Sequence, residues 1–205
     1  SVAELKTLVE KLCDRLGWEP FFEGVVDNPY LADFYQNMSA WAFHSQVFFL
    51  THRLRSHINL AQHPNSVIQD RSVYEDAEVF ARNLYNQGLI ADRDYSTYRE
   101  LYQVLIEFLP PPDLVVYLRA STDTLMNRIA FRDRSYERQM ERDYIHELNN
   151  AYEDFFSKPY DHTPVLKIDT NDLDIIRNTE HLQLIENRIR QSLNLTPFQP
   201  SLPLE

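Results

Sequence analysis

The chain of 205 residues is 43% hydrophobic and 25% charged, which is the balance of a globular protein and excludes a disordered one. A chain of this length can bury a sizeable core, so we expect residues 1–205 to form a single domain. The formal net charge of −11 argues against broad binding to nucleic acid or to an anionic membrane, because both need a basic face.

Cysteine and histidine usage narrows the class of protein further. Cys13 is the only cysteine, which excludes an internal disulfide framework and fits a reducing compartment, so we expect a cytoplasmic protein. The seven histidines show no metal-ligand spacing, and the sequence has no serine or cysteine nucleophile constellation. We find no signal-like amino terminus and no apolar run long enough to span a bilayer, so we expect no membrane partner.

Apolar spacing and breaker residues predict helices that alternate with short strands. The predicted helices cover residues 5–16, 39–62, 77–85, 94–109, 122–131, 137–156 and 174–193, with a further helix beginning near Pro29. The predicted strands cover residues 21–23, 66–68, 114–118 and 165–169. Alternation of this kind indicates an α/β fold in which helices flank a parallel sheet.

The segment between the strand at 66–68 and the helix at 77–85 carries polar residues suited to a ligand. Asp70 offers a carboxylate for a metal, Arg71 a guanidinium for phosphate oxygens, and Ser72 a hydroxyl at an N-cap position. Open parallel sheets place their ligands at the carboxyl ends of strands, where this segment falls. A helix cap with a surface ion pair explains the segment equally well by itself, but the rest of the sequence favours a nucleotide site.

Three arginines, Arg128, Arg132 and Arg134, crowd the end of the helix predicted at 122–131. Guanidinium groups this close repel one another unless anions lie nearby. One interpretation is a solvated face on which neighbouring acids pair with them. The other is a lid, residues 128–140, whose arginines close over a polyphosphate and stabilise charge during phosphoryl transfer.

Glu23 stands at the end of the strand predicted at 21–23. An acid in such a place is ordinarily a surface residue or a helix cap. If it lies beside Arg71 at the same sheet edge, it is instead placed to take the proton from an attacking hydroxyl.

Polar residues within an aromatic helix form a second candidate constellation. Gln46 and Arg53 are seven residues apart and therefore share one face of the helix at 39–62. A satisfied core amide is the ordinary explanation for Gln46. With Arg53, Asp76 and Phe80 nearby, the alternative is a nucleobase site that combines an amide, a donor, an acceptor and a stacking ring.

Four segments, taken in order, resemble the deoxynucleoside kinase family, and most closely its bacterial deoxyadenosine/deoxyguanosine kinases. They are residues 17–23, 41–46, 70–76 and 128–137, and the likeness extends over residues 6–175. The resemblance implies a P-loop kinase fold that transfers the γ-phosphoryl group of ATP to the 5′-hydroxyl of a deoxynucleoside, with Mg²⁺, in nucleotide salvage. It also implies a homodimer, for which the aromatic faces of the helices at 39–62 and 94–109 offer a surface.

Position by position, the resemblance implies a role for each motif residue. The residues implied in phosphoryl transfer are the general base Glu23, its neighbour Arg71 and the lid arginines Arg128, Arg132 and Arg134. The residues implied in binding the deoxynucleoside are Tyr35 and Glu137 at the 3′-hydroxyl, Gln46, Arg53 and Asp76 at the base, and Phe80 as the stacking ring. The residues implied in binding ATP are Lys6, Thr7 and Asp169, with Asp70 and Thr7 near the metal. The Arg53–Asp76 pair resembles that of purine and cytidine kinases, so we expect purine deoxynucleosides to be favoured.

The amino-terminal end departs from the family pattern. Family members carry a phosphate loop, G-x-x-x-x-G-K-S/T, whereas this sequence has no glycine before Gly17. Lys6 and Thr7 match the end of such a loop, and residues 1–4 would then be a remnant of the first strand. Because the lid arginines are present, we expect the loop to lie outside this sequence rather than to have been lost.

Two other functions remain open at this point. A kinase-fold subunit that binds nucleosides or assembles with a partner, without catalysis, would explain the missing phosphate loop. A nucleoside monophosphate kinase on a similar fold is disfavoured by Tyr35 and Glu137 as sugar ligands, and by Glu23, whose charge would repel a monophosphate.

Overall fold

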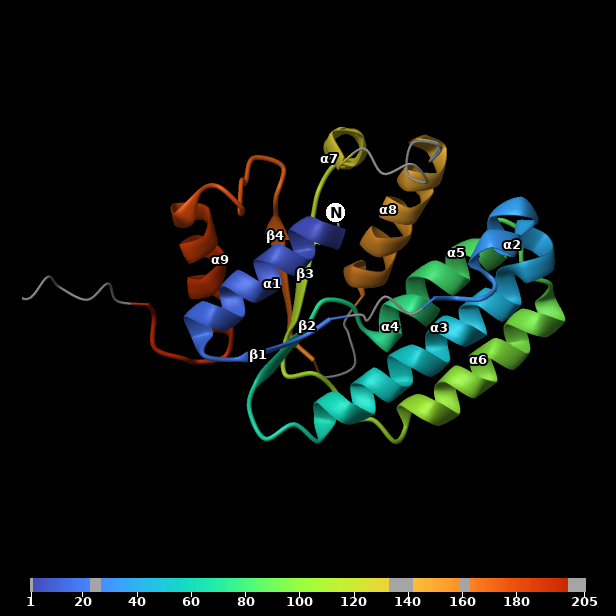
Figure 1. Ribbon diagram of the computed structural model, residues 1–205, viewed down its shortest axis with the longest axis horizontal. Helices are drawn as coiled ribbons and strands as arrows, with labels where there is room; N and C mark the ends of the chain where they lie inside the picture. The colour runs from blue at the N-terminus through green and yellow to red at the C-terminus, as the bar shows by residue number, and fades with distance from the viewer. Residues whose placement is uncertain (1, 23–26, 133–141, 159–162, 199–205) are drawn as a thin grey trace, which may run out of the picture.

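The computed structural model describes residues 2–22, 27–132, 142–158 and 163–198 (Figure 1). Its helices are α1 (Val2–Leu16), α2 (Leu31–Gln36), α3 (Met38–Ala61), α4 (Val73–Glu75), η1 (Asp76–Ala81), α5 (Arg82–Asn86), α6 (Asp92–Ile106), α7 (Thr122–Arg132), α8 (Arg142–Ser157) and α9 (Thr179–Ser192). Its strands are β1 (Glu19–Phe21), β2 (Val67–Gln69), β3 (Val115–Arg119) and β4 (Val165–Asp169). Across the described residues no helix is both long enough and apolar enough to cross a bilayer.

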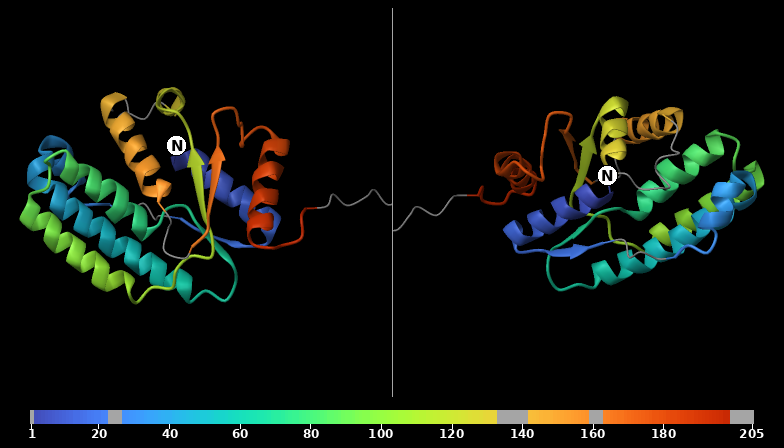
Figure 2. Two further views of the ribbon diagram at one scale, coloured as in Figure 1. Left: turned by 180° about the vertical axis from the view of Figure 1, so that it is seen from behind. Right: turned by 45° about the horizontal axis from the view of Figure 1, so that its top comes forward.

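The strands form two parallel pairs between layers of helices. β1 pairs with β2, with Pro20 opposite Ile68, and β3 pairs with β4, with Tyr117 opposite Lys167. The helices α1 and α9 lie on one side of the strands, and α3, α5, α6 and α8 lie on the other (Figures 1 and 2). This arrangement confirms the α/β class, with parallel strands flanked by helices, that the sequence predicts.

The two strand pairs share one apolar core with α1 and α9. Ile68 of β2 and Ile168 of β4 pack in the same cluster as Leu8 and Leu12 of α1 and Ile185 of α9. Burying one such side chain stabilises a fold by about 1.5–3 kcal/mol. The shared core therefore holds both strand pairs against the same two helices.

A second apolar core joins α3, η1 and α6. Leu50 of α3, Ala77 and Ala81 of η1 and Tyr98 of α6 are each at most 1% exposed. The small alanine side chains let η1 approach the neighbouring helices closely. This approach brings Asp76, the first residue of η1, against α3.

The middle of the helical run at 73–86 differs from the sequence prediction. Between α4 and α5, η1 is a π-helix, whereas the sequence pattern predicts an ordinary helix over 77–85. Such turns are rare, occur mostly as single-turn insertions and are frequent at functional sites. This one carries Asp76 and Phe80, two of the residues expected at a nucleobase.

The interpretation of residues 1–4 as a strand remnant is wrong for the part that the structure describes. Residues 2–4 form the first turn of α1, where Glu4 lies favourably near the positive end of the helix dipole. The apolar spacing that predicts a helix from Leu5 simply begins earlier, because Glu4 and Ala3 are compatible with a first turn.

The last helix begins at Thr179 rather than at 174. The Asn178 side chain accepts hydrogen bonds from the backbone N–H groups of Glu180 (2.9 Å) and His181 (3.4 Å), which is N-cap geometry. Local capping by Asn178 therefore outweighs the apolar spacing that extends the prediction towards the strand.

Candidate active site

The segment expected to bind a ligand lies at the carboxyl end of the β1–β2 pair. The Asp70 backbone N–H donates to the Phe21 carbonyl (3.4 Å), which ties the residue after β2 to the end of β1. Asp70 and Arg71 are half-buried there. Ser72 is the N-cap of α4, as predicted, and Glu75 accepts from its backbone N–H (3.1 Å) and hydroxyl (3.4 Å). This capping box fixes the backbone from which Arg71 projects.

The structure brings Arg71 and Phe80 together. The guanidinium carbon of Arg71 lies 4.6 Å from the centroid of the Phe80 ring, which is a cation–π contact. Tyr152 of α8 meets the same ring edge-on, with the centroids 6.0 Å apart and the planes at 90°. Because Arg71 covers one face of the ring, a base stacked on Phe80 would use the opposite face.

Glu75 and Tyr152, to which sequence reasoning assigned no role, lie beside this contact. The Tyr152 hydroxyl donates to Glu75 Oε2 at 3.0 Å. Burial raises the pKa of Glu75, while the Arg71 charge and the bonds from Ser72 and Tyr152 oppose the rise. A signal for Tyr152 exists in the sequence, because its spacing of four from Phe156 places two aromatic rings on one face of α8.

The polar residues expected to read a base are also assembled. Arg53 Nε lies 2.9 Å from Asp76 Oδ2, and the two side chains are 4% and 5% exposed. Gln46, which is 7% exposed, hydrogen-bonds to no other residue that the structure describes, so the described residues do not satisfy its amide. Burying an ion pair costs desolvation free energy, and a role in binding a ligand would account for that cost.

Tyr35 of α2, expected at the 3′-hydroxyl, is electrostatically coupled to Tyr144 of α8. Tyr35 is 51% exposed. Burial raises the pKa of the Tyr144 hydroxyl, and both Tyr35 and Arg71 act on it electrostatically. Tyr144 of α8 therefore lies close enough to Tyr35 of α2 and to Arg71 to feel the charge of each. The remaining expected residues lie outside the described part of the chain: Glu23, Arg134, Glu137 and the Arg132 side chain.

Arg128 lies at the carboxyl end of β4. Its Nη1 donates to the Thr170 hydroxyl (3.1 Å) and its Nη2 to the Thr170 carbonyl (2.5 Å). Asp169 Oδ1 accepts from the backbone and side-chain N–H groups of Asn171, both at 2.9 Å. Arg128 is thus joined to the residue that follows Asp169, the side chain expected at ATP.

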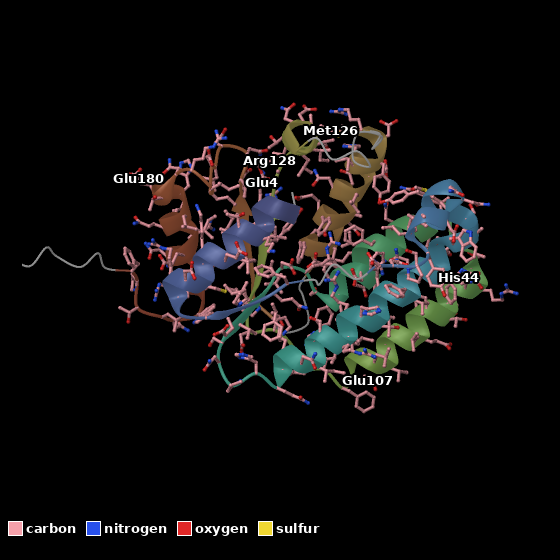
Figure 3. All side chains as sticks on the ribbon, in the orientation of Figure 1. Glu4, His44, Glu107, Met126, Arg128 and Glu180 are labelled. Atoms are coloured by element: carbon pink, nitrogen blue, oxygen red, sulfur yellow. The ribbon has the colours of Figure 1, made fainter. Side chains whose placement is uncertain are left out.

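Lys6 and Thr7, expected at the ATP phosphates, lie in α1. Figure 3 shows Glu4, on the same helix, and Arg128 next to each other in the upper middle of the view. Lys6 is exposed, and its Nζ lies 5.1 Å from the centroid of the Phe22 ring. The amino-terminal part of α1 is therefore oriented towards the end of the molecule that carries Arg128.

The metal site expected at Asp70 and Thr7 is a sparse one. No group of three or more histidine, cysteine, aspartate or glutamate side chains suited to a metal occurs among the described residues. Mg²⁺ commonly takes one or two carboxylates and completes its shell with substrate phosphates and water. A half-buried carboxylate at Asp70 and a half-buried hydroxyl at Thr7 fit that ion.

Comparison with known proteins extends over nearly the whole chain. The sequence model named "Deoxynucleoside kinase" matches residues 6–194. The chain is 34% identical to the deoxyadenosine/deoxycytidine kinase of Bacillus subtilis (strain 168), with 89% of this chain and 85% of that protein covered. It is 37% identical to the deoxyguanosine kinase of Lactobacillus johnsonii, with 87% of this chain and 82% of that protein covered.

A solved structure agrees with these matches. The deoxyadenosine kinase of M. mycoides with the products dCMP and a flexible dCDP bound has a TM-score of 0.80 and 30% identity, covering 93% of this chain and 95% of that one. The fold and the sequence matches are thus those of an enzyme that transfers phosphate to nucleosides. More particularly, the chain belongs to the deoxynucleoside kinase family.

Proposed function

We propose that this kinase transfers the γ-phosphoryl group of ATP to the 5′-hydroxyl of deoxynucleosides and favours purine deoxynucleosides, as a step of nucleotide salvage. The observation that carries the proposal is the buried Arg53–Asp76 pair with the Gln46 amide on the same helix. Together these groups offer both donors and acceptors to the edge of a base. The relatives' names specify deoxyadenosine, deoxycytidine or deoxyguanosine, which supports deoxynucleosides as the substrate class. Deoxyadenosine and deoxyguanosine are purine deoxynucleosides.

The transfer itself is assigned to an acid and a set of arginines. Glu23 accepts the proton of the 5′-hydroxyl as that oxygen attacks the phosphorus. Arg71, which lies over the Phe80 ring, stabilises negative charge on the transferring group. The lid arginines close over the polyphosphate from the other side: Arg128, Arg132 and Arg134.

The remaining residues bind the two substrates. Phe80 stacks on the base with the ring face that Arg71 leaves open, and Tyr35 and Glu137 hold the 3′-hydroxyl. On the donor side, Lys6 and Thr7 contact the ATP phosphates, and Asp169 lies by the adenine. Asp70 and Thr7 would hold Mg²⁺, which when bound neutralises charge on the phosphates.

Turnover with each deoxynucleoside tests the function. With ATP and Mg²⁺ supplied, we expect a higher kcat/KM for deoxyadenosine and deoxyguanosine than for thymidine, measured by chromatography of the monophosphates. Glu23→Gln should lower kcat by about 100-fold or more with little change in KM. The matched control Glu19→Gln, at an exposed position of β1, should keep the wild-type kcat.

Two different outcomes would contradict the role of Glu23 and the kinase function. Equal turnover by Glu23→Gln and Glu19→Gln would remove Glu23 as the base. Deoxyadenosine binding by calorimetry without any phosphorylation would replace the kinase with a nucleoside-binding subunit.

We also propose that the kinase is a homodimer. Large apolar side chains are exposed along the outer faces of α3 and α6: Ile58 (47%), Leu101 (41%), Val104 (55%) and, just beyond α6, Phe108 (80%). The two helices lie side by side, away from α1 and α9 (Figures 1 and 2). A second copy would remove this apolar surface from water, and a twofold axis would bury the same patch on both chains.

A cytoplasmic location is a third part of the proposal. The single cysteine, Cys13, is buried, and burial raises its pKa to about 11, so the thiol stays protonated. A buried protonated thiol is inert, which agrees with a protein that lives under reducing conditions without disulfides.

A further inference from the structure

Three contacts connect four side chains, Arg71, Phe80, Tyr152 and Glu75, into one cluster. The Arg71 guanidinium lies over the Phe80 ring at 4.6 Å, and the Phe80 ring meets Tyr152 edge-on at 6.0 Å. The Tyr152 hydroxyl donates to Glu75 Oε2 at 3.0 Å. Burial raises the pKa of Glu75, and the Arg71 charge opposes that rise, so the guanidinium favours the ionised carboxylate beside it.

Residues outside this cluster also hold Glu75 and Tyr152 in place. The second oxygen of Glu75 accepts from the Ser72 backbone N–H at 3.1 Å, so both carboxylate oxygens are engaged. The Tyr152 ring lies nearly parallel to Tyr117, with centroids 6.0 Å apart and planes at 7°, and it also packs against Phe156 at 6.4 Å. These contacts leave Glu75 and Tyr152 little conformational freedom.

An arginine that acts on a transferring phosphoryl group must be placed before the reaction begins. Its long side chain loses much rotamer entropy when it is fixed, and an ill-placed guanidinium stabilises the transition state poorly. A neighbouring carboxylate held by its own partners supplies a fixed counter-charge for the guanidinium. The Phe80 face adds a second contact from the other direction.

We propose that Glu75 and Tyr152 are positioning residues that hold the Arg71 guanidinium over the Phe80 ring for phosphoryl transfer, an inference that rests on the proposed kinase function. The bond joins residues 77 positions apart, on α4 and α8. It therefore also links the placement of Arg71 to the packing of α8 against α4 and η1.

The same helix offers a matched control. The Tyr117 hydroxyl donates to Glu153 of α8 at 2.9 Å, so it makes the same kind of bond at nearly the same length. Glu153 instead accepts hydrogen bonds from Arg119 at the end of β3. The Tyr117–Glu153 bond therefore lies outside the cluster that contains Arg71. Tyr117→Phe and Tyr152→Phe each remove one hydroxyl and leave an aromatic ring in the same stack.

Steady-state kinetics separate positioning from simple stabilisation. We expect Tyr152→Phe to lower kcat by about tenfold while KM for deoxyadenosine changes less than about twofold. Tyr117→Phe should leave both constants within about twofold of wild type. In an Arg71→Lys background, Tyr152→Phe should lower kcat no further, because the two changes act through one group.

Two results would overturn the inference while leaving the kinase function intact. One is an equal kcat for Tyr152→Phe and Tyr117→Phe in an enzyme that turns over. The other is the same fold loss from Tyr152→Phe in the wild-type background and in the Arg71→Lys background. If Tyr152→Phe does not fold, Glu75→Gln, which keeps the size of the side chain and removes its charge, is read in the same way.

A spectroscopic readout keeps the inference testable if the wild type shows no turnover and the kinase proposal fails. The Nε–Hε signal of Arg71 is assigned by its loss in Arg71→Lys in a ¹⁵N-correlated NMR spectrum. Tyr152→Phe should shift this signal and Tyr117→Phe should not. An Arg71 signal that is the same in wild type, Tyr152→Phe and Tyr117→Phe would reject the positioning role.

Discussion

Asp76 and Arg53 show at the residue scale how the fold keeps charge inside the protein. Asp76 is 4% exposed and Arg53 is also 4% exposed, and they meet at 2.9 Å across the contact between η1 and α3. Water cannot solvate either charge there, so each depends on the other. The pair is therefore expected to matter far more to stability than an ion pair on the surface.

Asp76→Asn should lower the free energy of unfolding by about 3 kcal/mol, because it leaves the Arg53 guanidinium buried without this counter-charge. The control Asp154→Asn removes a carboxylate that pairs with Lys158 at 3.4 Å, where the side chains are 62% and 66% exposed. The control should change stability by less than about 0.5 kcal/mol. Urea unfolding measures both, and equal losses would show that burial does not govern the pair.

His57 predicts a pH dependence of stability. It is 4% exposed, its Nε2–H donates to the Pro110 carbonyl (3.0 Å), and its Nδ1 has no partner among the described residues. Burial lowers the pKa of His57 below its usual value of 6.5, although the Pro110 bond opposes the shift. As the pH falls below that value, the unfolded chain takes up a proton and the folded one does not, so stability falls, by at most about 1.4 kcal/mol per pH unit.

The measurement compares wild type with His57→Gln, whose amide still donates to the Pro110 carbonyl. Free energies of unfolding are determined at pH 7.5 and 5.5. We expect the wild type to lose more stability over this interval than the variant. The same loss in both proteins would show that His57 does not contribute to the pH dependence.

At the scale of the secondary-structure elements, α4 and η1 determine where Asp76 and Phe80 lie. The capping box at Ser72 and Glu75 starts the helical run, and the π-helical turn at η1 then sets the direction in which Asp76 and Phe80 project. The alanines of η1 are buried between α3 and α6: Ala77 and Ala81 are 0% exposed. Protein cores are close-packed, so there is little room there for a larger side chain. The geometry of the proposed base site thus depends on alanine side chains that have no polar group of their own.

Ala77→Leu should destabilise the protein by about 1–3 kcal/mol, because the added carbons overfill the core between α3, η1 and α6. It should also weaken deoxynucleoside binding, because the overfilled core displaces Asp76. Ala61→Leu, at the exposed last residue of α3, is the control and should be near neutral. Urea unfolding and calorimetry measure the two effects, and a variant at 77 as stable as the control would contradict this account.

The whole molecule presents two unlike surfaces. One is the site at the carboxyl ends of the strands, and the other is the apolar outer face of α3 and α6. Val104→Glu, which places a charge on that face at a position 55% exposed, should convert the proposed dimer to a monomer. The control Leu184→Glu lies on α9 at 48% exposure and should not affect assembly.

Light scattering after size exclusion measures the mass of each variant. We expect the wild type and the control near twice the chain mass of 24.4 kDa, and Val104→Glu near the single mass. A wild type that stays monomeric at high concentration would reject the dimer.

The sequence predicted local features of the structure more completely than features that depend on packing between elements. It predicted the strand and helix order and the N-cap at Ser72, because periodicity and capping are local. It missed the π-helical turn, because the choice between the two hydrogen-bond patterns depends on packing against α3 and α6. It gave Glu75 no role, because its bond to Tyr152 closes only when α8 packs on η1.

The sequence by itself determined the family, the α/β class and the kinds of side chain that the site contains, since these follow from short motifs in a set order. The tertiary structure alone decided that Glu75 accepts a hydrogen bond from the Tyr152 hydroxyl, 77 positions away, and that Arg128 binds Thr170, 42 positions away. Contacts between distant positions depend on how whole elements pack, and no local pattern of residues encodes that packing.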